Sequence, residues 1–173
     1  MSRALVVLMG LPGCGKTTLA RWIAANSDIV VTSRDTIRAA MFPECSYTIE
    51  EKNAAYAAMK SAMAITLALG RSVCTDGMTF ANQSDRDDMA TLAREASVRL
   101  VLVHCDCPIP IAQARVAADT DTWFPDRDAA AVIEVASRLL PVPLEAEQLD
   151  MMQQTEEAGR ELLGRLAALG RAG

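Results

Sequence analysis

The sequence predicts an α/β fold in which a parallel sheet carries helices on both faces. Apolar runs of strand length alternate along the chain with segments of helical periodicity, and this alternation is typical of parallel sheets. The first apolar run, Ala4–Met9, contains no polar position, as expected for a strand buried on both faces. It leads through a glycine-rich segment, residues 10–17, into a helical pattern that extends to Ala25.

The glycine-rich segment fits the pattern G-x-x-x-x-G-K-[ST] at every fixed position. Its glycines let the backbone turn sharply and bring N–H groups close to an anion, and the N-terminus of the next helix adds a positive dipole end. Lys16 is placed to reach the β- and γ-phosphates of a nucleotide, and the Thr17 hydroxyl is placed to ligate Mg²⁺. The predicted nucleotide-binding residues are Gly10, Leu11, Pro12, Gly13, Cys14, Gly15, Lys16, Thr17 and Thr18.

Length and composition restrict the class of protein. The chain has 173 residues, 51% of them apolar, which suits one domain spanning residues 1–173. A net charge of −5 argues against wrapping a long nucleic acid, but a local basic pocket can still hold a strand end. The sequence contains no evident signal peptide and no apolar run of membrane-spanning length. Together with five cysteines, this predicts a cytoplasmic protein with reduced thiols.

The remaining elements follow from periodicity and from helix-end signals. Strands are predicted at residues 28–32, 72–76, 98–105 and 148–151. Helices are predicted from residue 33 to Phe42, at 48–69, at 82–96, from Pro108 onward, at 126–140 and at 155–169. Thr48 and Glu51 form a capping box, and Gly70 ends that helix. Asn82 and Asp126 are the predicted caps of two later helices, and the polar stretch 119–126 is predicted to be a mobile loop.

Two charged residues follow the second predicted strand, at the edge where parallel sheets bind ligands. Asp35 is suited to position an attacking hydroxyl and to accept its proton; alternatively, it caps the following helix. Arg38 lies three residues on, and hence on the same helical face. It is suited to hold a phosphate or carboxylate of the acceptor, and an exposed salt bridge is the alternative.

Three further residues are candidates for the same site. Asp76 ends the third strand and is suited to hold Mg²⁺ through water or to contact the acceptor, or else to form the following turn. Arg86 lies among three aspartates, so acceptor binding and surface pairing both remain open. Arg115 follows the fourth strand and is suited to meet charge on a transferring phosphoryl group.

Four stretches of the chain share features with a known group of enzymes. They are residues 10–17, Ser33-Arg34-Asp35-Thr36-Ile37-Arg38, residues 73–76 followed by 82–86, and Asp106-Cys107-Pro108 with Arg115. Through them the chain resembles P-loop kinases of the polynucleotide 5′-hydroxyl kinase type, relatives of zeta toxins and small antibiotic phosphotransferases. The resemblance implies a P-loop NTPase fold, a helical lid at about residues 108–140, and an ATP-dependent kinase.

By this resemblance, Asp35 is the general base and Arg38 binds a phosphate next to the acceptor hydroxyl. Asp76 touches the acceptor side, and Arg115 is the lid arginine. The relatives often carry a second lid arginine a few residues later. Residues 116–119 offer none, so Arg127 is the candidate to replace it.

The expected function is transfer of the γ-phosphoryl group of ATP to a hydroxyl group, with Mg²⁺ as the metal. The Asp35 and Arg38 pair favours a phosphate-bearing acceptor, hence a nucleoside, nucleotide or nucleic acid 5′-hydroxyl. The acidic net charge and short length favour the alternative, a small natural product or sugar. A nucleotide-dependent switch without an acceptor is a third hypothesis, weakened because the chain lacks a guanine-reading Asn-Lys-x-Asp.

Overall fold

The computed structural model describes residues 3–44, 46, 48–119 and 128–169. Its centre is a five-stranded sheet with the order β2-β3-β1-β4-β5, and every neighbouring pair is parallel. The strands are β1 (Ala4–Met9), β2 (Val30–Ser33), β3 (Val73–Asp76), β4 (Arg99–Asp106) and β5 (Glu147–Asp150).

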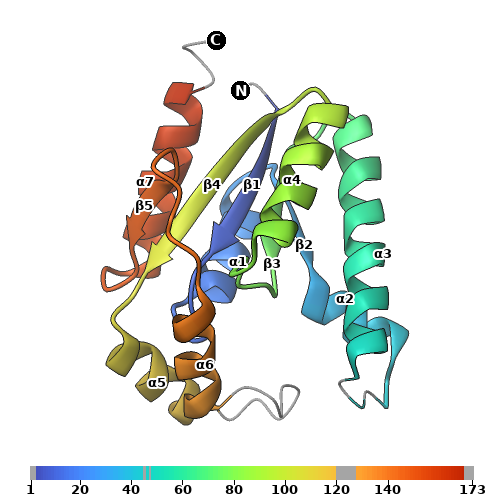
Figure 1. The fold of residues 1–173 in the computed structure, drawn as a ribbon. Coiled ribbons are helices and arrows are strands. Elements are labelled where there is room, and N and C mark those ends of the chain that lie inside the picture. Colours follow the sequence, from blue (N-terminus) through green and yellow to red (C-terminus); the bar gives the residue numbers. More distant parts are fainter. Residues whose placement is uncertain (1–2, 45, 47, 120–127, 170–173) are drawn as a thin grey trace.

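Helices cover both faces of this sheet (Figure 1). The helices are α1 (Lys16–Asn26), α2 (Arg34–Met41), α3 (Ile49–Ala68), α4 (Gln83–Glu95), α5 (Ile109–Ala118), α6 (Ala129–Arg138) and α7 (Thr155–Leu169). Helices α1 and α7 contribute to the apolar core on one face, and α3 and α4 contribute to the core on the other. Helices α5 and α6 lie past the carboxyl ends of the strands (Figure 1). The predicted P-loop NTPase fold is confirmed.

The central strand β1 separates two apolar cores, since successive side chains point to opposite faces. Val6 and Leu8 lie in the core that includes α1 and α7, whereas Leu5 and Val7 lie in the core that includes α3 and α4. All six residues of β1 are buried, as its unbroken apolar run predicts. On α3, Met59, Met63 and Leu67 recur at helical spacing, and all three are fully buried in the second of these cores.

Several predicted helix ends are confirmed. At the start of α3, the Glu51 backbone N–H donates to Thr48 Oγ1 at 3.2 Å, and Thr48 N donates to Glu51 Oε2 at 3.2 Å. This is the predicted capping box. Gly70 follows the last turn of the helix with a φ of +84°, which glycine adopts without steric strain. Helix α7 has the predicted bounds.

The structure differs from the predictions at the caps of three helices. Ser33, not Asp35, caps α2: its hydroxyl accepts from Thr36 N at 3.4 Å. Asn82 stands at the cap of α4 but makes no capping bond; its amide instead lies 3.5 Å from Asp85 Oδ2. Asp128 caps α6 by accepting from Ala131 N at 2.7 Å, whereas the predicted cap Asp126 lies outside the described residues.

The bounds of two strands differ from the predictions, because pairing with a neighbouring strand determines where each strand begins or ends. The second strand begins at Val30, two residues later than predicted, because β3 pairs only with residues 30–33. The fourth strand extends to Asp106, which pairs with Asp150 of β5.

The predicted mobile loop at 119–126 and the candidate Arg127 fall almost entirely outside the described residues. Within the described parts, no helix combines the length and apolarity that crossing a membrane requires.

Candidate active site

The glycine-rich loop joins β1 to α1 and packs tightly against neighbouring backbone. A Cβ on Gly13 would lie 2.4 Å from the Ala112 carbonyl oxygen of α5, and one on Gly10 would lie 2.8 Å from the Cys105 carbonyl oxygen of β4. Both contacts are too short for any side chain. Both residues also have positive φ, +77° and +140°. Glycine is therefore required at these positions by the fold and not only by a ligand.

Lys16 lies at the centre of this loop with its ammonium group turned inward. Its Nζ donates to the carbonyl oxygens of Gly10 at 3.0 Å and Leu11 at 2.7 Å, and it lies 3.5 Å from Cys14 Sγ. Gly10, Leu11 and Cys14 do not line the cavity beside the loop, although they are predicted nucleotide-binding residues. Their contacts hold the lysine head group in place.

Cys14 is fully buried beneath the loop. A hydrogen bond with the Cys105 thiol lowers the pKa of Cys14 to about 5; burial opposes this shift and the Lys16 ammonium reinforces it. The same hydrogen bond, together with burial, raises the pKa of Cys105 well above its usual value. The hydrogen bond and the ammonium group thus favour the charged form of Cys14 next to the lysine.

Thr17 and Asp76 lie side by side at the carboxyl edge of the sheet. Thr17 Oγ1 donates to Asp76 Oδ1 at 2.8 Å, although 59 residues separate them in sequence. A hydroxyl and a carboxylate oxygen are hard ligands of the kind that Mg²⁺ binds. This donor set fits the predicted metal, and the two residues would hold it at the edge of the phosphate loop.

Asp35 and Arg38 form a buried ion pair at the start of α2. Arg38 Nη2 lies 3.2 Å from Asp35 Oδ1, and Arg34 Nη2 lies 3.6 Å from the same oxygen. Arg38 is only 3% exposed, so the alternative of an exposed salt bridge is wrong. A Cβ on Gly77 would lie 2.9 Å from the Asp35 backbone nitrogen, so the turn after β3 leaves room for Asp35 only because residue 77 is glycine.

Arg115 on α5 connects the glycine-rich loop to the segment after β5. Its Nη2 donates to the Met151 carbonyl at 3.1 Å, and its Nη1 lies 3.5 Å from the Cys14 carbonyl. Its side chain also lines the cavity. This position brings a cation to the phosphate loop, as the sequence predicts.

Arg86, a predicted acceptor-binding residue, lies elsewhere. It is buried, and its guanidinium donates to the carbonyl oxygens of Phe80 at 2.9 Å, Pro141 at 2.9 Å and Leu140 at 3.3 Å. It does not line the cavity. Acceptor binding and surface pairing with acids are both wrong for Arg86, which instead fastens α4 to the chain that follows α6.

A cavity of about 990 Å³ extends from the glycine-rich loop in two directions. One end lies beside α2, which follows the edge strand β2, and the other lies beside the residues that follow the opposite edge strand β5. Of the predicted site residues, Pro12, Gly13, Gly15, Lys16, Thr17, Thr18, Asp35, Arg38 and Arg115 line it. Of the predicted acceptor-binding residues, Asp35 and Arg38 thus share the cavity with the glycine-rich loop, whereas Asp76 and Arg86 do not line it.

Sequence reasoning missed several polar residues of the cavity: Arg21, Arg34, Lys52, Asp85, Arg138 and Gln153. For Arg34, the sequence does offer a signal, because this residue stands directly before Asp35. Its buried Nε makes no hydrogen bond within the described part of the structure. Burial raises the pKa of Asp85, and the nearby Arg34 opposes this. Gln153 and Lys52 carry no sequence signal, because folding alone brings them to the loop.

Comparisons with known proteins agree with this architecture. A gluconokinase from Sinorhizobium meliloti 1021 has 20% identity and a TM-score of 0.68, with 98% of this chain and 94% of that chain covered. The APS kinase CysC from Mycobacterium tuberculosis, solved with AMPPNP and APS, has 15% identity and a TM-score of 0.68 over 96% of this chain and 99% of that one.

A Pnkp1/Rnl/Hen1 complex matches less completely, with 22% identity and a TM-score of 0.58 over 70% of this chain and 40% of that chain. The search of curated proteins gave no match. The family described as "AAA domain" matches residues 5–137, which is most of the chain and includes the glycine-rich loop, Asp35, Asp76 and Arg115. The chain therefore belongs to this AAA domain family and has the P-loop NTPase fold that these kinases share.

Proposed function

We propose that the protein transfers the γ-phosphoryl group of ATP to a hydroxyl group of a small polar molecule, such as a sugar or another small natural product. The observation that carries this proposal is the shared cavity. Lys16 of the glycine-rich loop and the buried Asp35 carboxylate both line it. A carboxylate that faces the phosphate loop is suited to accept the proton of an attacking hydroxyl.

The residues then have distinct roles. Loop N–H groups and Lys16 bind the phosphates, and Arg115 meets negative charge that develops on the transferring group. Asp35 orients the acceptor hydroxyl and takes its proton while the oxygen attacks the γ-phosphorus and ADP leaves. Thr17 and Asp76 would hold Mg²⁺, which would neutralise negative charge on the phosphates.

Three observations favour a small acceptor over a nucleic acid end. The cavity has to hold the nucleotide and the acceptor together within about 990 Å³. The chain has a net charge of −5, which repels an extended polyanion. Its fold matches a gluconokinase and an APS kinase over nearly the whole chain, and the Pnkp1 complex over 70% of it.

A nucleotide or nucleic acid 5′-hydroxyl is the second candidate acceptor. It is favoured by the two arginines beside Asp35, since a guanidinium pair suits a phosphate or carboxylate on the acceptor. The Nε of Arg34, which has no hydrogen-bond partner among the described residues, adds one more donor.

An acceptor panel tests the proposal. The protein is incubated with Mg²⁺, γ-labelled ATP and, separately, sugars, sugar acids, nucleosides and a single-stranded oligonucleotide with a 5′-hydroxyl. We expect labelled product with a small polyol or sugar acid, and a Lys16→Ala variant about 10²–10³-fold slower but folded normally. Phosphorylation of the oligonucleotide alone would support the second candidate. Wild-type turnover by the Lys16 variant would contradict the proposed site.

A further inference from the structure

The half of the cavity that lies away from Asp35 must receive the base of the nucleotide. With the phosphates on the loop and the γ-phosphate toward Asp35, the ribose and base extend the other way, past Gly15. That side is bordered by α5 and by the residues after β5: Met151, Gln153 and Thr155 line the cavity there. A Cβ on Gly15 would lie 3.1 Å from the methyl group of Met151, so this segment lies directly against the loop.

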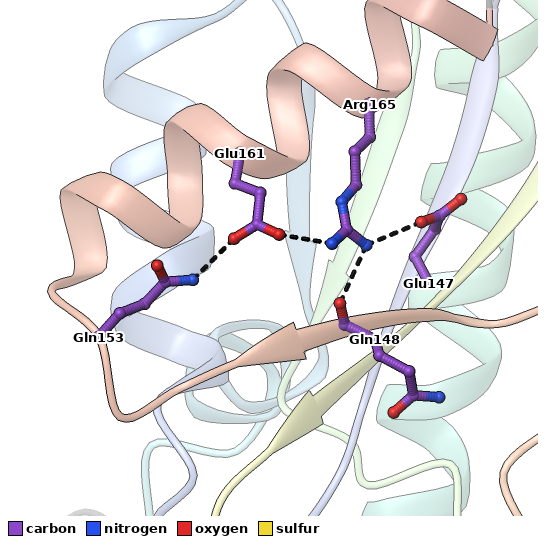
Figure 2. A network of polar contacts seen from close by, with 5 residues as sticks. All are labelled: Glu147, Gln148, Gln153, Glu161 and Arg165. Atoms are coloured by element: carbon purple, nitrogen blue, oxygen red, sulfur yellow. Dashed lines mark hydrogen bonds and ion pairs between the residues drawn. The ribbon is translucent and has the colours of Figure 1, made fainter.

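Of the residues of this segment that line the cavity, Gln153 is the one with an amide group. Its Nε2 donates to Glu161 Oε2 at 2.8 Å. A carboxylate only accepts hydrogen bonds, so the nitrogen of the amide must face Glu161. Figure 2 shows the amide nitrogen directed toward Glu161 and the amide oxygen turned away from it. The oxygen of Gln153 is therefore the atom left to accept a bond from a ligand.

Glu161 is itself held in place by Arg165. The Arg165 guanidinium contacts Glu161 on the same helix, Glu147 Oε2 at 2.8 Å and the Gln148 carbonyl at 2.9 Å (Figure 2). It therefore joins α7 to β5 through two acceptors, Glu147 and the Gln148 carbonyl. Because Glu161 cannot turn away without breaking this group of contacts, it fixes the orientation of the Gln153 amide. Glu161 and Arg165 act as positioning residues.

We infer that Gln153 reads the base of the bound nucleotide and selects adenine over guanine; this inference rests on the proposed function. The 6-amino group of adenine can donate to the Gln153 oxygen. Guanine has a carbonyl oxygen at the same position, so two acceptors would face each other there. Such a mismatch leaves polar groups unpaired in a partly dehydrated site and lowers affinity.

Equilibrium binding of ATP and GTP to the full chain, with Mg²⁺ and without an acceptor, tests this inference. We expect wild type to bind ATP about tenfold more tightly than GTP, or better. Gln153→Leu should bring the ratio of the two Kd values close to one, mainly by weakening ATP. Glu161→Leu should lower the ratio as well, because the amide of Gln153 can then rotate.

Glu156→Leu is the matched control. Glu156 pairs with Arg160 at 2.6 Å on the same helix, four residues apart as in the Glu161 and Arg165 pair, but it does not line the cavity. This variant should keep the wild-type ratio. An unchanged ratio in Gln153→Leu, or a wild-type ratio near one, would overturn the role of Gln153. If wild type bound neither triphosphate, the proposed function itself would fail.

Discussion

Asp35 is the residue whose replacement tests the chemistry most directly. Because Ser33 and not Asp35 caps α2, an asparagine at position 35 leaves the helix start intact. Its side-chain oxygen can still accept from the buried Arg38, which lies 3.2 Å from Asp35 Oδ1. We expect Asp35→Asn to lower kcat by about 10²–10⁴-fold and to change the Kd for ATP little.

Thermal unfolding, ATP affinity and kcat should be measured on the same preparation of Asp35→Asn. A modest fall in Tm is acceptable, since the ion pair with Arg38 becomes a neutral hydrogen bond. A kcat within a few-fold of wild type would leave Asp35 only as an ion-pair partner of Arg38 and Arg34. The search for the base would then move to Asp76.

Cys14 gives a prediction about pH. Its sulfur lies 3.5 Å from Lys16 Nζ, so a thiolate there would compete with the phosphates for that ammonium. The pKa of Cys14 is lowered to about 5, so the thiolate is present at neutral pH and is lost as the pH falls through that value. We expect Cys14→Ser to bind ATP severalfold more tightly than wild type at about pH 8, because the serine is neutral there.

The difference between Cys14→Ser and wild type should shrink as the pH is lowered toward 5, where the wild-type thiol gains its proton. Calorimetric titration with ATP across this range measures it. Cys107→Ser is the control, because burial raises the pKa of Cys107 and its thiol stays protonated at neutral pH. A constant difference across the pH range would show that Cys14 carries no charge in the folded protein.

At the scale of elements, the packing of α7 on α1 depends on one glycine. A Cβ on Gly159 would lie 2.1 Å from the nearest ring atom of Trp22, whereas a Cβ on Gly164 would have no atom within 4 Å. Gly159→Ala should therefore destabilise the fold by about 1–3 kcal/mol, since overpacking outweighs the helix preference of alanine. Gly164→Ala, on the same helix, should stabilise it by about 0.5–1 kcal/mol.

Denaturant unfolding of the two glycine variants against wild type measures this contrast. Matching changes in the free energy of unfolding would mean that the two helices do not pack closely at Gly159. The pair separates packing from propensity because both substitutions add the same methyl group to the same helix.

Arg86 connects elements that the sequence leaves unrelated. Its guanidinium donates to three backbone carbonyls, two of them in residues 140–141. Arg86→Met should leave these acceptors unpaired and lower the free energy of unfolding by about 1–3 kcal/mol. ATP affinity should stay at the wild-type value, measured in the same buffer. A variant with normal stability and a raised KM for the acceptor would restore the acceptor-binding role.

The sequence predicts an element well when residues close together in the chain determine it, and poorly when distant residues do. Residues within a few positions of one another predict the unit formed by β1, the glycine-rich loop and α1. The same is true of the capping box at Thr48. The start of β2 is different, because β3 decides which residues pair. The sequence does not single out the caps of α2 and α6, because two residues able to cap stand close together near each helix start. These pairs are Ser33 with Asp35 and Asp128 with Asp126.

At the scale of the whole molecule, the cavity combines a predictable half with a less predictable one. The phosphate loop, Asp35 and Arg38 lie in short motifs or just after strands, so they can be assigned from sequence. Gln153 and Lys52 cannot, since they reach the cavity only through the packing of α7 and α3. Arg86 shows the reverse error: it has the spacing of a site residue, but the chain after α6 offers it carbonyl acceptors.

Because different elements build the two halves, the nucleotide and the acceptor should respond separately to substitution. Arg38 lies beside Asp35, whereas Gln153 and Arg115 border the other side of the loop. Arg38→Ala should raise the KM for an anionic acceptor by about tenfold or more, the value of a charge-assisted contact, and change the KM for ATP little. Arg38→Lys keeps the charge and should lose less.

Steady-state kinetics with both substrates varied, together with thermal unfolding, measures this separation for Arg38→Ala and Arg38→Lys. The unfolding data matter because Arg38 is buried, and a general loss of structure would raise both KM values together. Equal effects on ATP and acceptor in a folded variant would contradict a phosphate or carboxylate on the acceptor. They would indicate a neutral sugar or polyol, held by hydrogen bonds in the half of the cavity between α2 and α6.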